Sequence, residues 1–235
     1  MTVPSPSEPR LVLTDIEGTT TAISFVHDRL FPFAAEALEG FLAARGADAD
    51  VAPILAEVAA AAPGRPVLET LRGWMAADAK VTPLKALQGL IWRQGYADGR
   101  LAGHLWPDVA PALRAWHGRL RLAVYSSGSE EAQRQLFGHS EAGDLIGLFE
   151  AFLDTRMGGK REATSYTAIA VRLGLPAAEI LFLSDVAAEL DAARAAGCAT
   201  CQLVRPADGT QPAGHHPIAA NFTEVSRLFA LPQAG

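Results

Sequence analysis

The sequence predicts an α/β fold in which a largely parallel sheet carries a small helical domain inserted after its first strand. Short apolar, β-branched runs recur at residues 11–14, 120–125, 180–183 and 199–204. Helical patterns follow most of these runs, and that alternation is typical of parallel sheets. Roughly a hundred residues separate the first two runs, far more than a crossover between parallel strands requires.

The inserted segment begins after the first strand, and we place it at residues 25–105. It is rich in alanine and leucine, and Gly46, Pro63-Gly64 and Thr82-Pro83 interrupt it. Helical periodicity is present at residues 33–45, 51–62, 66–77 and 84–96. We therefore expect a helical cap here, with the catalytic core formed by residues 1–24 and 106–235.

The later elements of the core follow the same alternation. Residues 163–173 have helical spacing before Gly174, and the alanine-rich residues 187–196 precede Gly197. The segment 205–217 contains proline, glycine and the pair His215-His216, so we expect a surface loop. A last short helix is expected at residues 223–229.

Composition limits the classes of protein. Of 235 residues, 49% are hydrophobic, and no apolar run approaches the roughly 18 residues that a membrane span needs. The N-terminal residues do not resemble a secretory signal, so we expect a cytoplasmic protein without a membrane partner. Twenty basic residues against 26 acidic ones leave a net charge of −6, which disfavours nucleic acid as a partner.

The two cysteines, Cys198 and Cys201, form a C-x-x-C pair that could serve redox chemistry or zinc. No second pair of cysteines or histidines stands nearby to complete a zinc site. The segment around them reads as a buried strand, which we prefer.

Two carboxylates close the first strand. Asp15 and Glu17 follow an apolar run, and the carboxyl ends of parallel strands are where open α/β folds build their sites. Ser126-Ser127-Gly128 follows the second strand, Asp185 follows the strand at 180–183, and Lys160 stands between them in sequence. We expect these residues to meet at one edge of the sheet.

Their chemical types suit phosphoryl transfer. Carboxylates without clustered His or Cys favour a hard divalent ion such as Mg²⁺, while serine, backbone N–H groups and lysine can hold a phosphoryl group. Asp15 is then the candidate nucleophile, through an aspartyl-phosphate. Each residue also has an ordinary structural explanation: a polar turn for Asp15 and Glu17, a helix cap for Asp185, a solvated side chain for Lys160. Ser129 is itself expected to cap a helix.

In the order of four motifs, the chain resembles the haloacid dehalogenase-like hydrolase superfamily, which implies a Rossmannoid core. The motifs are Asp15 to Thr19, Tyr125 to Ser129, Lys160, and Leu183 to Asp185. Further residues resemble the acireductone synthases, the bifunctional enolase-phosphatases of methionine salvage, with Glu17 where most phosphatases of the superfamily carry Asp. These residues are 15–21, 23–26, 30–32, 74–75, 84–92, 107–109, 136–140 and 160–166.

This resemblance implies a Mg²⁺-dependent monomer, with one ion per subunit. Its implied substrate is 2,3-diketo-5-methylthiopentyl 1-phosphate, which is enolised and then dephosphorylated to the acireductone 1,2-dihydroxy-3-keto-5-methylthiopentene. Asp15, Glu17 and Asp185 would serve the metal, and Ser126, Ser127 and Lys160 the phosphate. Asp15, Glu17 and Lys160 would act in catalysis, Glu17 as a candidate acid/base.

Four points stay open at this stage. Gly159 stands where the family commonly has His, so any contact of that histidine is absent. Another phosphatase or a phosphomutase of the same superfamily, a silent phosphate-binding module, and a dehalogenase remain as alternative functions. The enolisation base is not assigned, and Trp74, Met75, Trp92 and Trp106 are candidates for an apolar substrate wall.

Overall fold

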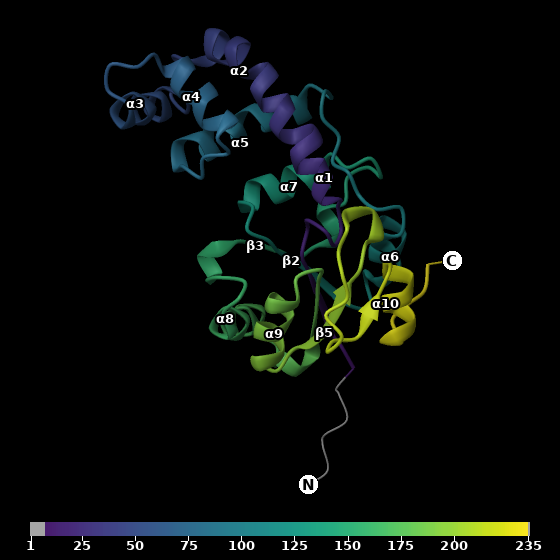
Figure 1. The fold of residues 1–235 in the computed structure, drawn as a ribbon. Coiled ribbons are helices and arrows are strands. Elements are labelled where there is room, and N and C mark those ends of the chain that lie inside the picture. Colours follow the sequence, from purple (N-terminus) through teal and green to yellow (C-terminus); the bar gives the residue numbers. More distant parts are fainter. Residues whose placement is uncertain (1–7, 235) are drawn as a thin grey trace. The chain divides into compact units, whose positions relative to one another are not determined.

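The structure is a computed structural model of the chain and describes residues 8–234 (Figure 1). Residues 1–7 and 235, which the sequence analysis assigns to the core, lie outside the described part. The chain separates into two compact units: Ser24–Ala102, and the rest of the described residues. Within residues 8–234, no helix is both long and apolar enough to cross a membrane.

The larger unit contains a six-stranded sheet in the order β3-β2-β1-β4-β5-β6. The strands are β1 (Leu11–Thr14), β2 (Arg121–Tyr125), β3 (Ala151–Leu153), β4 (Ile180–Ser184), β5 (Ala199–Leu203) and β6 (Ile218–Ala219). Every pairing is parallel. The predicted α/β fold with a parallel sheet is therefore confirmed, whereas the sequence analysis misses the short edge strands β3 and β6.

Helices cover both faces of this sheet. They are α6 (Val109–Trp116), α7 (Glu130–Gly138), α8 (Ala163–Leu173), α9 (Ala187–Ala195) and α10 (Phe222–Leu228). In Figure 1, α8 and α9 lie on one side of the sheet, and α6 and α10 lie on the other. All four residues of β1 are buried, because helices pack on both of its faces.

The alternation of side chains along the strands divides the core between the faces. Leu11 and Leu13 pack in one cluster with Ile169 of α8 and Leu190 of α9. On the other side, Trp116 of α6 stacks on Phe222 of α10, and its indole N–H donates to Ser226 Oγ at 2.9 Å. Two apolar layers thus hold the sheet and fix the positions of its strand ends.

The smaller unit is helical. Its main helices are α2 (Phe31–Arg45), α3 (Ala52–Ala61), α4 (Val67–Ala76) and α5 (Thr82–Ala97), preceded by α1 (Ile23–Phe25) and a π-helical turn at Val26–Leu30. Buried leucines, valines and aromatics from all four main helices form its own core. The indole N–H of Trp92 donates to the Leu30 carbonyl at 2.8 Å, so this side chain stabilises the unit internally.

Two expectations about individual residues can be compared with the structure directly. Cys198 and Cys201 are buried, free thiols, and burial raises the pKa of Cys198 to about 11 and that of Cys201 to about 12. The expectation that the pair His215-His216 lies at the surface is wrong for His216. Its side chain is 0% exposed, because the loop folds back onto α9 and β5.

Candidate active site

The register of the sheet places Asp15, Ser126 and Asp185 at one edge. Thr14 lies beside Val124 of β2 and beside Leu183 of β4, so the residues that follow all three strands emerge together. The Asp15 N–H continues the ladder by donating to the Leu183 carbonyl at 2.9 Å. This is the carboxyl edge of the sheet, where the sequence analysis expects the site.

Lys160 reaches this edge from the loop before α8. The Tyr166 hydroxyl donates to the Lys160 carbonyl at 2.7 Å, and the Tyr125 hydroxyl donates to the Gly158 carbonyl at 2.9 Å. Gly158 has a φ of 116°, and a Cβ there would collide with Ser165 Oγ. A glycine is therefore required for the turn that delivers the lysine.

The Lys160 ammonium lies between two buried carboxylates. Its Nζ is 2.6 Å from Asp15 Oδ1 and 2.7 Å from Glu189 Oε2, and the three side chains are only 7–11% exposed. Burial alone lowers the pKa of Lys160, but the charges of Asp15 and Glu189 outweigh it and raise that pKa above its ordinary value. Lys160 is therefore a charged, fixed cation and not a solvated surface lysine.

Asp185 lies against the loop that follows β1. Its backbone N–H donates to Thr19 Oγ1 at 3.0 Å. Gly18 has a φ of 73°, and a Cβ on it would lie 2.5 Å from the Asp185 carboxyl carbon. Only glycine allows this approach. Val186, not Asp185, occupies the cap position of α9, and no side chain bonds there, so the helix-cap explanation of Asp185 is wrong.

The Asp185 carboxyl group has properties that suit a metal ligand. Its Oδ1 is buried and has no hydrogen-bond partner among the described residues. Burial, followed by the charge of Asp15, raises the pKa of Asp185 to about 7. A cation shared with Asp15 would give the Asp185 oxygen a partner and offset the repulsion between the two carboxylates. An all-oxygen donor set suits a hard divalent ion. The residues present therefore fit a divalent metal ion.

Glu189 is the residue that the sequence analysis missed. It lies in the first turn of α9, accepts a hydrogen bond from Ser184 Oγ at 2.9 Å, and pairs with Lys160. Burial and the Asp15 carboxylate raise the pKa of Glu189. One signal was available: it is the single acid in the alanine-rich first turn of a helix that follows a site strand.

The remaining predicted residues lie on the same loops. Ser126 is buried, and its Oγ accepts the Gly128 N–H at 3.2 Å, while Ser127 and Glu17 are exposed. Ser129 caps α7 by accepting the Ala132 N–H, as expected. The structure thus brings Asp15, Lys160 and Asp185 together, and places Ser127 and Glu17, both exposed, on the loops that follow β2 and β1.

Gly159 bears on the departure from the family pattern. A Cβ at this position would lie 2.8 Å from Glu162 Oε1. Because Glu162 is an exposed, flexible side chain, it can move aside. The local backbone would therefore accept a larger residue here after a side-chain shift, and the placement of Lys160 does not depend on one.

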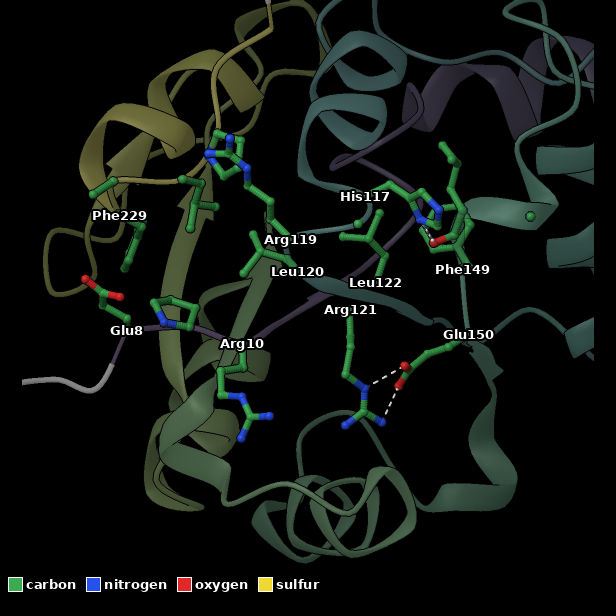
Figure 2. Close-up of a pocket in the computed structure, with 17 residues that line it drawn as sticks. Glu8, Arg10, His117, Arg119, Leu120, Arg121, Leu122, Phe149, Glu150 and Phe229 are labelled. Carbon is green, nitrogen blue, oxygen red and sulfur yellow. Dashed lines mark hydrogen bonds and ion pairs between the residues drawn. The ribbon is translucent and has the colours of Figure 1, made fainter.

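A cavity of about 780 Å³ lies at the opposite, amino edge of the sheet (Figure 2). It is lined by Arg10 before β1, by the start of β2 and by Glu150 before β3. The Arg121 guanidinium donates to Glu150 at 2.6 and 2.7 Å. None of the predicted site residues lines this cavity, so it is separate from the carboxyl-edge site.

The parallel sheet, with Asp15, Lys160 and Asp185 at its carboxyl edge, agrees with the resemblance to the haloacid dehalogenase-like hydrolases. The family model of that description matches residues 9–197. Phosphatases of this superfamily generally depend on a metal ion. A 2-haloacid dehalogenase from Pseudomonas syringae pv. Tomato shares the fold, at a TM-score of 0.59 and 18% identity, over 94% of this chain and 98% of that one.

Comparison with individual proteins identifies the family within this superfamily. "Enolase-phosphatase E1" of Acidiphilium cryptum is 57% identical over 96% of this chain and 98% of its own. The protein of the same name from Granulibacter bethesdensis is 59% identical over 95% and 98%. The crystal structure of the UTR4 protein of Saccharomyces cerevisiae, 32% identical, covers 92% of this chain and 99% of that one at a TM-score of 0.80. The chain belongs to the enolase-phosphatase family of these hydrolases.

Proposed function

We propose that this enzyme converts 2,3-diketo-5-methylthiopentyl 1-phosphate to the acireductone 1,2-dihydroxy-3-keto-5-methylthiopentene and phosphate, in methionine salvage, with one Mg²⁺ per subunit. The family membership supports the pairing of enolase and phosphatase activities. The observation that carries the phosphatase half is the contact of Lys160 Nζ with Asp15 Oδ1 at 2.6 Å, beside the unpartnered oxygen of Asp185.

Asp15 is the proposed nucleophile. Lys160 orients its carboxylate through the 2.6 Å contact, and a carboxylate oxygen is the nucleophile that attacks phosphorus. The bond from phosphorus to the substrate oxygen breaks as the bond to Asp15 forms, and water later hydrolyses the aspartyl-phosphate. The Lys160 ammonium also offsets the negative charge that spreads over the phosphoryl oxygens during transfer.

Ser126, Ser127 and Lys160 are the proposed phosphate contacts, with the backbone N–H groups at Gly128 nearby. Asp15, Glu17 and Asp185 are the proposed metal ligands, and Mg²⁺ suits them because every donor is an oxygen. When bound, the ion would supply charge neutralisation for the transferring phosphoryl group. Glu189 holds Lys160 from the side opposite Asp15, so we assign it a positioning role.

The enolase half requires removal of a proton from the carbon beside a carbonyl. Glu17 is the proposed acid/base, because its side chain is exposed on the loop that follows the nucleophile. The role of Ser24–Ala102 as a cap over the site stays a prediction, as do the monomeric state, the cytoplasmic location, and the absence of nucleic-acid and membrane partners.

The deciding experiment mixes the protein and Mg²⁺ with a 2,3-diketo-1-phosphoalkane and follows enol absorbance and released phosphate in parallel. We expect an enol signal followed by one equivalent of phosphate. A Glu17→Gln variant should lose enolisation, so it should show little or no enol absorbance. Phosphate release without any enol would favour a different phosphatase of the superfamily. If neither enol nor phosphate appears, the proposal is overturned.

A further inference from the structure

Two histidines and an aspartate form a second cluster away from the Lys160 site. Asp191 lies on α9, and His215 and His216 lie in the loop before β6. One ligand atom from each residue lies within 4.8 Å of the other two. His215 Nε2 is 3.0 Å and His216 Nε2 is 3.2 Å from the same oxygen, Asp191 Oδ1.

Hydrogen bonds to the second ring nitrogens orient both imidazoles. His215 Nδ1 is 3.1 Å from the Ala213 carbonyl, and a carbonyl only accepts, so this nitrogen carries the proton. Nε2 is therefore the nitrogen that faces the Asp191 carboxylate. An added proton or a metal cation between them satisfies both groups.

His216 is held more firmly still. Its Nδ1 lies 2.9 Å from Thr200 Oγ1 of β5, and its side chain is fully buried. A hydroxyl on one ring nitrogen, with the other aimed at a shared point, is the outer support that metal-binding histidines commonly have.

The distances suit a small ion. Tetrahedral Zn²⁺ with bonds of about 2.1 Å separates its ligand atoms by about 3.4 Å. The two Nε2–Oδ1 separations of 3.0 and 3.2 Å are slightly shorter, so a modest outward rotation of the exposed Asp191 side chain would admit the ion. Three protein ligands at a half-exposed position leave a coordination place for water.

One group opposes cation binding. The Arg194 guanidinium donates to Asp191 Oδ1 at 2.9 Å and to the His215 carbonyl at 2.9 Å. It is half-exposed and lies on the same helix as Asp191. It therefore both orders the cluster and competes with a metal for the same oxygen, which gives the test its sharpest variant.

We propose that Asp191, His215 and His216 bind a divalent first-row transition-metal ion, with Zn²⁺ as the probe, independently of the Mg²⁺ carboxylates. Two imidazoles and a carboxylate suit such ions better than Mg²⁺. Glu189 and Asp191 are two positions apart on α9, so their side chains point about 200° apart, and only Glu189 faces Lys160. The bound ion fastens the loop before β6 to α9.

The same loop has a second attachment, which shows where the fastening would act. The Gln202 side chain donates to the carbonyls of Asp185 and Gln211, and accepts the Ala213 N–H. The metal cluster and Gln202 therefore hold the loop on either side of Gly214. A bound ion should raise the unfolding temperature of the protein without requiring any turnover.

The experiment titrates Zn²⁺ into tag-free protein in excess Mg²⁺, against a chromophoric chelator, and records the unfolding temperature. We expect one equivalent of Zn²⁺ to bind and to stabilise the fold. Asp191→Asn and His215→Gln should each weaken binding by about 100-fold or more. Both residues are half-exposed, so these variants should fold; His117→Gln, at a distant exposed histidine, should bind as the parent does.

Substitution of Arg194 should change the affinity for Zn²⁺ in the opposite direction. Arg194→Gln removes a competing charge and should tighten Zn²⁺ several-fold, whereas Arg194→Lys keeps the charge and should not. The proposal is overturned if the parent protein binds no Zn²⁺ in the presence of excess Mg²⁺. It is overturned as well if Asp191→Asn leaves Zn²⁺ binding unchanged. It is also overturned if Arg194→Gln weakens binding. Loss of phosphatase activity plays no part in these readouts, so failure of the proposed function would leave them intact.

Discussion

The two edges of one sheet handle charge in opposite ways. At the carboxyl edge, Lys160 and its two carboxylates are 7–11% exposed. At the amino edge, the ion pairs are open to water: Arg10 is 65% and its partner Glu179 25% exposed. Arg121 and Glu150 are 38% and 31% exposed. Burial makes the first set energetically decisive, and solvent screens the second.

The balance of charge differs as well. At the amino edge, Arg10 and Arg121 each pair with one carboxylate, whereas at the carboxyl edge one lysine lies near three acids, Asp15, Asp185 and Glu189. Burial, followed by the negative charge of Asp15, raises the pKa values of both Asp185 and Glu189. The difference teaches that the proposed functional edge is the one with unbalanced charge, which the proposed metal ion would complete. Substitutions at the carboxyl edge should therefore affect activity and stability more than substitutions at the amino edge.

The largest effect is expected for Asp15→Asn. The amide cannot attack phosphorus, so the rate of phosphate release should fall by about 10⁴-fold or more, with the fold intact. Steady-state phosphate release with Mg²⁺ measures it. Asp48→Asn, an exposed pair on the helical unit, is the matched control and should be silent. Appreciable turnover by Asp15→Asn would show that Asp15 is not the nucleophile.

Lys160→Met should give the largest loss of stability. It leaves two buried carboxylates without their cation, which costs about 3–5 kcal/mol in the free energy of unfolding of the metal-free protein at pH 7. Urea unfolding measures it. Adding Glu189→Gln should recover part of the loss, because one buried charge disappears with the lysine. A loss below about 1 kcal/mol, or no recovery in the double variant, would contradict the buried-pair interpretation.

The affinity for Mg²⁺ should depend on pH through Asp185. Its pKa of about 7 in the metal-free fold, against an ordinary 3.8, means that the ion must displace a proton below that pH. Affinity should fall about tenfold per pH unit below about 7 and level off above it. Calorimetric titration measures it, and a flat profile from pH 5 to 7 would refute the assignment.

The same shift makes a linked prediction about stability. Because the folded metal-free state holds the Asp185 proton more tightly than the unfolded chain, this group's contribution to stability is fully present below about pH 4. It is lost as the pH rises through about 7. Asp185→Asn should flatten that part of the pH profile of the unfolding free energy.

The sequence specified those parts of the fold that depend on continuous patterns. Strands buried on both faces give uninterrupted apolar runs, so β1, β2, β4 and β5 were predictable to within a residue or so. With only three and two residues, β3 and β6 carry no readable period. Their existence depends on pairing with neighbours that are distant in sequence.

The site divides in the same way. Asp15 and Asp185 follow strands, and parallel strands share a carboxyl edge, so their meeting could be inferred. The place of Glu189 depends on how α9 rotates against β4, and the burial of His216 depends on the path of a loop. Local periodicity predicts neither the rotation of the helix nor the path of the loop. For this reason Glu189 was missed and His216 was expected at the surface.

The smallest effect is expected at the amino edge. Arg10→Ala removes an exposed pair with Glu179, which screening and side-chain entropy reduce to about 0.5 kcal/mol or less in the free energy of unfolding. Turnover should be unchanged, because the pair lies at the far ends of the strands that carry Asp15 and Asp185. Urea unfolding at low and high salt measures it, and salt should shrink the difference further. A loss above about 2 kcal/mol, or any drop in phosphate release, would show that the amino edge is coupled to the site, and the contrast between the edges would fail.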